Sequence, residues 1–361
     1  MELIQIGVTL KTLSPLHHGF TEPAETGEGG HKKTMRLVRQ VALLLPNHEG
    51  QWIRKVVPVL GGNALRGRMR RVAAAATMDV LGITPEQFVA NGRKAFHTIT
   101  SGGTLANKNA QLKVWSEHPA YRMERIAEWP LLSLFGFSFD DFMERSKLRV
   151  HFGWPLIQSI RPAIEIAHVD AALFPESDWI DTSAYDKTPY LAMEGNLWGR
   201  EGQQSAHYEY RHADDAIVPM PDTDHDENRD QERSGAVLAY QYVPAGIPFG
   251  VRMFAEDLTP LEQSLLRLIV ESTFPTDTMV LFGGRSASGM GVFQVQRQTG
   301  LDDLPHPDVY REYLLTHRDR LVNQLLHDQH FLTDADALQA LETASAPKKS
   351  AKSKKSEEPS S

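Results

Sequence analysis

The N-terminal part of the chain alternates between apolar and polar residues. Every second residue from Ile4 to Leu10 is apolar, which is the period of a half-buried β-strand, so we expect a first strand over residues 2–13. Residues 36–45 and 52–59 are apolar and β-branched around the sequence Pro-Asn-His-Glu-Gly, a pattern that predicts a β-hairpin. Before this hairpin, residues 14–33 show no periodicity and predict a long loop.

A helical spacing of apolar residues follows a pair of glycines. From Asn63 to Leu81 apolar residues recur every three or four positions, and Gly82 is typical of the end of a helix. A capping box with proline at the first helical position, at 259–262, predicts a second helix that runs to about Thr273. A further amphipathic pattern predicts one last helix over about 307–328.

Several other segments have the composition of strands. A helix after the first strand and another before the last strands suit an antiparallel sheet, whereas a doubly wound parallel sheet would need more helices. The pattern predicts an α+β fold with a ferredoxin-like (RRM-like) antiparallel sheet core and large insertions. The strand-like segments are 147–170, 236–243, 248–255, 278–282 and 290–297.

We divide the chain into a core, its insertions and a C-terminal part. The core is expected over 1–297, with a mainly helical insertion at 83–129 and a long polar insertion at about 171–235. Residues 298–344 are expected to form a helical extension. The tail, 345–361, consists of Lys, Ser, Ala, Pro and Glu and is expected to be disordered.

The composition excludes several kinds of chemistry. None of the 361 residues is cysteine, so disulfides, thiolate catalysis and cysteine-ligated zinc are excluded. The N-terminus has no basic segment that leads into an apolar run, and no stretch approaches the length that spans a membrane. We therefore expect a cytoplasmic protein that uses no cofactor and holds no metal.

The charge is unevenly distributed along the chain. The net charge of −8 argues by itself against a nucleic-acid partner, but ten basic residues and one acidic residue give residues 32–71 a charge of +9. Residues 209–232 contain nine acidic and two basic residues, a charge of −7. One face of the molecule could therefore bind a polyanion while another repels it.

The densest part of the basic segment joins a predicted strand to a predicted helix. Two glycines allow a sharp turn and the close approach of another molecule, and the free N–H groups that open a helix attract anions. Four arginines follow within six residues, and no acidic residue between Gln51 and Met78 can pair with them along the helix. These features favour a phosphate backbone over an ordinary solvated helix face. The segment reads LGGNALRGRMRR from Leu60 to Arg71.

Four segments resemble, in their order along the chain, the motifs of a known family. The segment at 58–70 (PVLGGNALRGRMR) resembles the glycine-rich signature of the RAMP superfamily of CRISPR-associated RNA-binding proteins. LLSLFG at 131–136 is similar to the family's xLFG segment, and YVPAGIPF at 242–249 to its hxPxGxxF segment. FGGRSASGMGVF at 282–293 resembles its late glycine-rich loop. The overall layout is most similar to the backbone subunit of type IV effectors.

The resemblance implies a function, partners and contact residues. It implies a non-catalytic subunit that repeats along a guide (CRISPR) RNA and forms the helical backbone of a ribonucleoprotein effector in antiviral or anti-plasmid defence. The partners would be copies of itself, other effector subunits and a complementary target strand, which base pairing selects. The polar insertion would carry a β-hairpin thumb that crosses the RNA. The residues expected at the RNA are Gly61, Gly62, Asn63, Arg66, Arg68, Arg70, Arg285, Ser286, Ser288 and His18.

Two other classes of function stay open at this point. One is a metal-dependent endoribonuclease that cuts target or precursor RNA. Related subunits that cut use an aspartate in the loop after the first strand, whereas here that loop holds three glutamates and three histidines, and no aspartate precedes Asp79. We expect contact rather than chemistry from this glycine-rich loop, because catalysis needs fixed geometry. The other class is a structural protein that polymerises without RNA.

Two features of the sequence have plain structural alternatives. The late glycine-rich loop at 282–291 could be no more than a tight turn, since its spacing matches no nucleotide-binding loop. Most tryptophans are expected in the core or at a subunit interface rather than on RNA bases.

Overall fold

The computed structural model describes most of the chain, in twelve segments. Arg285, Ser286 and Ser288 of the late glycine-rich loop lie outside them, as do residues 212–232 of the acidic segment, the four residues after it and the C-terminal residues 328–361. The described residues are 2–19, 24–26, 33–36, 38–46, 49–103, 119–139, 142–165, 169–181, 190–198, 204–211, 237–284 and 289–327.

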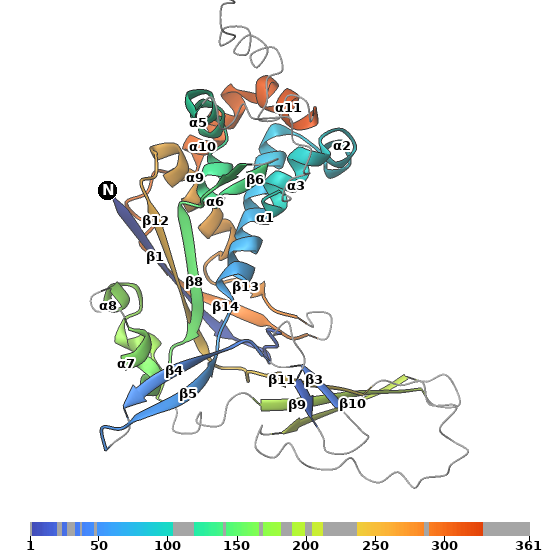
Figure 1. Ribbon diagram of the computed structural model, residues 1–361, viewed down its shortest axis with the longest axis vertical. Helices are drawn as coiled ribbons and strands as arrows, with labels where there is room; N and C mark the ends of the chain where they lie inside the picture. The colour runs from blue at the N-terminus through green and yellow to red at the C-terminus, as the bar shows by residue number, and fades with distance from the viewer. Residues whose placement is uncertain are drawn as a thin grey trace, which may run out of the picture.

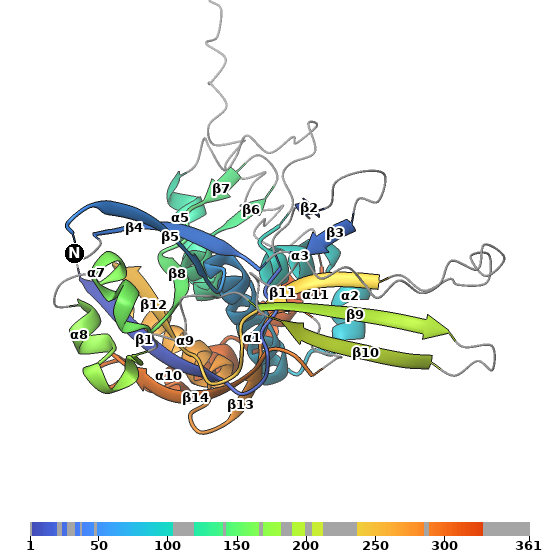
Figure 2. The same cartoon turned by 90° about the horizontal axis from the view of Figure 1, so that it is seen from below.

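The core is an antiparallel sheet of five strands. In chain order these are β1 (Leu3–Thr12), β8 (Leu148–Pro155), β12 (Pro248–Glu256), β13 (Met279–Leu281) and β14 (Val292–Thr299). They lie in the order β13-β14-β1-β12-β8, and each neighbouring pair is antiparallel. Figure 2 shows that the sheet curls around the helices. The α+β class with an antiparallel sheet is therefore confirmed.

Helices pack against the inner face of this sheet. α1 (Gly62–Leu81) follows the first strands and α9 (Pro260–Thr273) follows β12, and the two contact each other. The apolar residues predicted for the first strand face inward, with Ile6, Val8 and Leu10 fully buried. No helix among the described residues is long and apolar enough to cross a membrane. The other helices are α2 (Pro85–Asn91), α3 (Arg93–Ser101), α5 (Pro119–Glu128), α6 (Pro130–Phe135), α7 (Arg161–Ile164), α8 (Val169–Leu173), α10 (Asp308–Thr316) and α11 (Arg318–Leu326), with short 3-10 helices at Gln158–Ile160 and Glu176–Asp178.

A second sheet projects from the lower end of the core in Figure 1. Its strands are β2 (Ala24–Thr26), β3 (Lys33–Arg36), β9 (Tyr190–Trp198), β10 (Gln204–Arg211) and β11 (Val237–Tyr242), in the order β10-β9-β11-β3-β2. β9 and β10 form a hairpin paired over eight residues, and only the β11–β3 pair is parallel among the pairs of this sheet. Two further hairpins are β4 (Gln40–Pro46) with β5 (Trp52–Pro58), and β6 (Phe137–Phe139) with β7 (Phe142–Glu144).

The structure confirms some predicted elements and corrects others. The first strand, the first helix with its stop at Gly82, and the helix from Pro260 are confirmed. The last helix is not single, because the chain turns at His317, between α10 and α11. The strand predicted over 147–170 ends at Pro155 and short helices follow. The domain boundaries stay predictions.

The loop predicted over 14–33 is partly regular structure. Leu16 pairs with Val243 and His17 with Gly284, so its first residues bridge both sheets. The described parts further along belong to β2 and β3. The long-loop prediction failed here because partners more than 200 residues away in sequence supply the pairing, which no local pattern shows.

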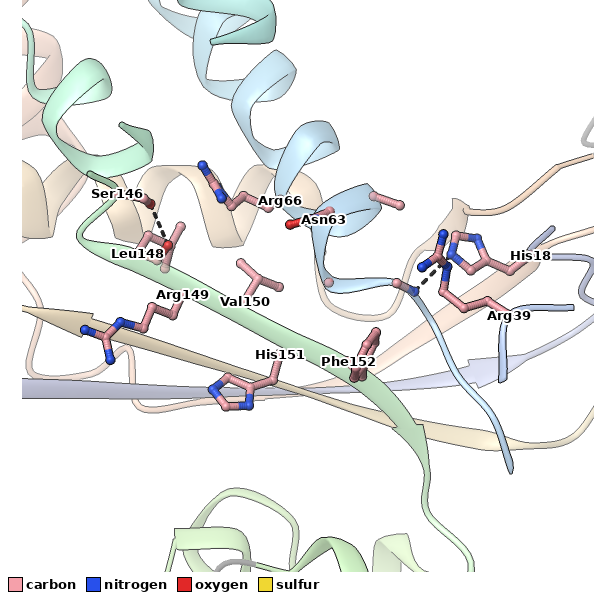
Figure 3. Close-up of a pocket in the computed structure, with 13 residues that line it drawn as sticks. His18, Arg39, Asn63, Arg66, Ser146, Leu148, Arg149, Val150, His151 and Phe152 are labelled. Atoms are coloured by element: carbon pink, nitrogen blue, oxygen red, sulfur yellow. Dashed lines mark hydrogen bonds between the residues drawn. The ribbon is translucent and has the colours of Figure 1, made fainter. Parts of the chain in front are cut away.

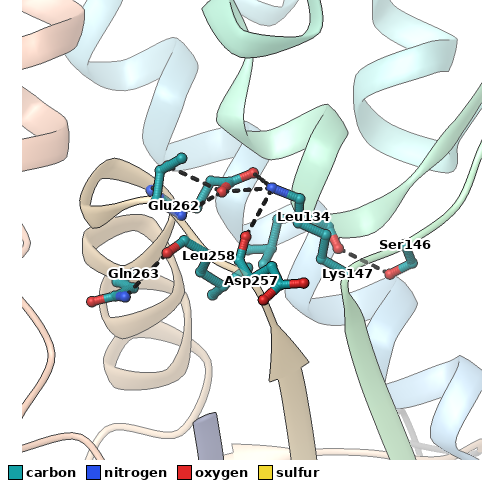
Figure 4. A network of polar contacts seen from close by, with 8 residues as sticks. Leu134, Ser146, Lys147, Asp257, Leu258, Glu262 and Gln263 are labelled. Carbon is teal, nitrogen blue, oxygen red and sulfur yellow. Dashed lines mark hydrogen bonds and ion pairs between the residues drawn. The ribbon is translucent and has the colours of Figure 1, made fainter. Parts of the chain in front are cut away.

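One ion pair fastens the start of β8 to α9 (Figure 4). Thr259 and Glu262 form the predicted capping box at the start of α9. Lys147 Nζ lies 2.8 Å from Glu262 Oε1 and donates a second bond to the carbonyl of Asp257. Burial acts to raise the pKa of Glu262, but hydrogen bonds from Lys147, Ser133 and the Thr259 backbone outweigh it and lower that pKa. The carboxylate thus stays charged and holds the edge strand against the helix.

Gly62 is required by the contact between α1 and β8, which a pair of matched substitutions can test. A methyl group on Gly62 would overlap the carbonyl oxygens of Val150 and His151, whereas one on Gly67 in the same helix would only meet Arg71 Nη1 at 3.7 Å. We expect Gly62→Ala to destabilise the protein by about 1–3 kcal/mol and Gly67→Ala to stabilise it by up to about 1 kcal/mol. Thermal unfolding of both variants checks this. Equal melting temperatures would contradict the close approach.

Candidate nucleic-acid interface

A cleft of about 550 Å³ lies between the first turn of α1 and the edge strand β8 (Figure 3). The start of α1 and the residue before it supply Gly61, Gly62, Asn63, Ala64 and Arg66. β8 and the residues before it supply Ser146 and residues 148–152. His18 from the loop after β1 and Arg39 from the segment before β4 line one end. The structure thus brings together five of the ten residues predicted at the RNA, namely His18, Gly61, Gly62, Asn63 and Arg66.

His18 fixes the turn that leads into α1. The Gly61 N–H donates to His18 Nε2 at 2.9 Å, so His18 is an acceptor at this nitrogen and carries its proton on Nδ1. Burial, followed by the positive charges of Arg39 and His17, lowers the pKa of His18 to about 4. The imidazole is therefore neutral near pH 7, and its part in the cleft is to position the glycine turn rather than to supply charge.

The open end of α1 points its backbone into the cleft. No side chain in the described part of the chain caps the helix at Gly61, and the first intrahelical acceptor, Gly61 O, accepts from the N–H groups of Ala64 and Leu65. The N–H groups of Gly62 and Asn63 precede those bonds and carry the partial positive charge of the helix N-terminus. Asn63 is exposed, and Figure 3 shows its side chain between α1 and β8. This arrangement suits an anionic oxygen.

Two arginines of α1 bond the end of α6, the predicted LLSLFG segment. Arg66 Nη2 donates to Phe135 O at 2.7 Å, and Arg70 Nη2 donates to Gly136 O. Carbonyls at a helix C-terminus lack intrahelical donors and carry partial negative charge, so guanidinium groups stabilise them. Arg70 also lies 5.4 Å from the Phe135 ring centre. Two segments that the sequence singled out separately are therefore joined.

Arg66 and Arg70 are four residues apart, a spacing that predicts both on one polar flank of the helix, but the structure buries Arg70. Its side chain is only 6% exposed, and burial, with the nearby charge of Arg66, lowers its pKa to about 10. Arg70 stays protonated at neutral pH, but its guanidinium is buried and donates to Gly136 O. The helical spacing that put Arg66 and Arg70 on one flank was correct, but α6 and the segment after α3 cover the second turn of that flank.

Arg68 links α1 to the late glycine-rich segment. Its Nη1 donates to Leu281 O, and its guanidinium lies 4.6 Å from the Phe282 ring centre. The same segment is held from the other side, since the Gly284 N–H donates to His17 O at 2.7 Å. Of the residues predicted there, Arg285, Ser286 and Ser288 lie outside the described residues, so their contact with RNA stays a prediction.

The charge around the cleft is positive. Arg39, Arg66 and Arg149 line it, and none of its thirteen described lining residues is acidic. Arg149 is paired with Glu256 at 2.8 Å. The bonds of Arg66, Arg68 and Arg70 to carbonyl oxygens satisfy donors without cancelling charge, so their field persists. Such a site attracts a polyanion.

The described residues give no support to a metal site in the loop after β1. Among them, no three His, Asp or Glu side chains gather as ligands would. His17 is buried and its Nδ1 lies 2.7 Å from Gln241 O, so it joins the loop to β11. Glu22, Glu28 and His31 lie outside the described residues.

Sequence reasoning missed the half of the cleft that β8 supplies. Arg149, His151 and Phe152 line it together with Arg39, yet none stood out by spacing. The one available signal was Gly62, since a glycine without a positive φ often marks the close approach of another chain segment. The glycines were expected to allow a ligand to come close to the backbone. The structure shows that the backbone of β8 is what lies close to Gly62.

Comparison with known proteins finds likenesses in structure. No family model matches the sequence, and no curated protein matches it. Among solved structures, a chain of a type IV-B CRISPR complex is similar with a TM-score of 0.49 and 18% identity, over 86% of this chain and 99% of that chain. Csc2 from Thermofilum pendens is similar with a TM-score of 0.31 and 12% identity, over 89% of this chain and 76% of that chain. We base the function on the residues of the cleft rather than on these likenesses.

His18 should make stability depend on pH. An unfolded chain binds a proton at this residue near pH 6.5, whereas the folded chain does so only near pH 4, so stability falls as pH drops through that window. The loss is at most about 3 kcal/mol. In His18→Gln an amide oxygen can accept from the Gly61 N–H, and the glutamine side chain does not titrate. The variant should therefore lose less unfolding free energy than the unmodified protein as the pH falls. Denaturant unfolding between pH 7 and 4 measures both proteins, and parallel stability curves would contradict the assignment.

Proposed function

We propose that the cleft between α1 and β8 binds the phosphate backbone of a guide RNA. The observation that carries the proposal is the combination of open helix N–H groups with arginines, without a carboxylate among the described residues that line the cleft. A phosphate placed there would accept from the Gly62 or Asn63 N–H and lie near Arg66 and Arg39. Backbone contacts of this kind hold a strand without reading its sequence.

We propose further that several copies line up along one RNA as the non-catalytic backbone of a type IV CRISPR effector. The four motifs quoted from the sequence support this, because the α1 arginines and His17 join the described parts of three of them around one site. The fourth, YVPAGIPF, begins at the end of β11 and pairs with the same loop through Val243. Other effector subunits and a complementary target strand would be the remaining partners, in the cytoplasm.

Two finer points of architecture belong to the same proposal. The order β14-β1-β12-β8, with α1 after β1 and α9 after β12, supports a ferredoxin-like core in which β13 is an added edge strand. The projecting β9–β10 hairpin supports a thumb that crosses the RNA.

The arginines of the cleft should set the salt dependence of RNA binding. The double variant Arg39→Gln with Arg66→Gln removes two charges, so the slope of log affinity against log salt should shrink by about 1.4 for a single strand. Arg311→Ala is the control, because it removes an exposed charge from α10, which packs near Thr77 at the far end of α1. Fluorescence anisotropy with single-stranded RNA measures the slopes. An unchanged slope in a double variant that melts normally would exclude these residues as phosphate contacts.

The assembled complex should leave RNA intact. The metal-dependent endoribonuclease alternative requires ligands in fixed geometry. Incubation with complementary RNA and Mg²⁺ or Mn²⁺, followed by denaturing electrophoresis, should return the full-length strand. If the RNA is cut at regular intervals and Glu28→Ala abolishes the cutting, the scaffold proposal is wrong and the protein is an endoribonuclease.

A further inference from the structure

An exposed aromatic ring stands at the mouth of the cleft. Phe152 of β8 is 38% exposed although the strand belongs to the core sheet, and it lines the cleft beside the glycine turn. Figure 3 shows it at the end of the cleft where His18 and Arg39 lie. Among the described residues that line the cleft, it is the one phenylalanine, tyrosine or tryptophan.

A break in strand pairing gives Phe152 this orientation. β8 and β12 pair at Val150 with Met253 and at Gly153 with Val251, so His151 and Phe152 together oppose the single residue Arg252. Two residues opposite one make a β-bulge, which re-aims side chains and is frequent beside functional sites. In a regular strand, successive side chains point to opposite faces of the sheet. The bulge interrupts this alternation at His151 and Phe152.

The ring is held in place from behind. Trp154 contacts Phe152 edge to face, with ring centres 6.0 Å apart, and the partly buried Trp154 packs against the hydrophobic core. His151 makes a similar contact with Phe254 at 4.9 Å, which anchors the bulge on the outer face. A ring that is fixed before a ligand arrives loses little entropy on binding. This is support for a binding surface, since a packing role alone would bury the ring.

We propose that Phe152 stacks on a nucleobase of the RNA whose phosphate lies at the start of α1. The inference rests on the proposed function of the cleft and adds a base contact to its phosphate contacts. Stacking on an aromatic side chain is tolerant of sequence, because every base has a π-face. It therefore suits a subunit that must accept guide RNA of any sequence.

The test separates base contacts from phosphate contacts on the full-length chain. Two fluorescein-labelled RNAs of equal length are compared, one of mixed sequence and one with abasic riboses through its central stretch, so that both carry the same phosphates. Removal of a stacking ring costs about 5- to 150-fold in affinity. Phe152→Ala should lose affinity in that range for the mixed-sequence RNA and stay close to the unmodified protein on abasic RNA. Phe152→Tyr should keep the difference between the two RNAs.

Two more variants control for folding and for general aromatic exposure. Phe152→Leu keeps most of the apolar volume, so it tests the proposal even if the alanine variant fails to fold. Because leucine has no aromatic ring, this variant should also lose the additional affinity for the mixed-sequence RNA. Trp52→Ala removes a more exposed ring, 71% exposed on β5 and outside the cleft, and should bind both RNAs as the unmodified protein does.

The inference is overturned if Phe152→Ala binds both RNAs as the unmodified protein does, or if it loses affinity equally for both. In those cases the salt dependence of the unmodified protein would still support the phosphate cleft. If the unmodified protein binds neither RNA, both the cleft function and the stacking contact are wrong.

Discussion

The structure depends on guanidinium groups that bond backbone carbonyl oxygens instead of carboxylates. Arg66 and Arg70 hold the end of α6, and Arg68 holds the end of β13, so one helix gathers segments that lie about 60 to 220 residues further along the chain. Carboxylate partners would have packed these segments equally well, but they would have cancelled the charge. Because carbonyls carry only partial charges, the same contacts that build the core leave a positive field at its surface. The same side chains thus join these segments and supply the positive charge on which the proposed function rests.

The local elements of the fold were predictable because they are written in short-range patterns. The period of two in β1, the apolar spacing of α1 with its stop at Gly82, and the capping box at Thr259 each need only a few neighbouring residues. The pairing of the loop after β1 was not predictable, since Leu16 meets Val243 and His17 meets Gly284. The break at His317 was also missed, because an amphipathic pattern can continue through a turn without losing its spacing.

The candidate site was predictable in part for the same reason. The glycine turn and the open helix start are local features, and the structure brings Gly61, Gly62, Asn63 and Arg66 together. What each side chain faces is a tertiary property. Arg70 falls under α6, His18 becomes a neutral acceptor for the turn, and Phe152 is turned outward by a bulge that exists only in the pairing of β8 with β12. β8 and β12 are about 100 residues apart in the sequence, so a local sequence pattern does not show how they pair.

The hydrogen bond between His17 and Gln241 gives the projecting sheet a mechanical connection to the cleft. Gln241 lies on β11, which pairs with the β9–β10 hairpin, and His17 is followed directly by His18, which holds the turn at Gly61. The hairpin is therefore connected to the start of α1 through β11 and two adjacent histidines. A displacement of the hairpin, such as one caused by a second strand bound beneath it, would be transmitted through these histidines to the backbone N–H groups where we propose that a phosphate binds. Binding of one strand at the cleft and of a second strand at the β9–β10 hairpin would then be coupled within a single subunit.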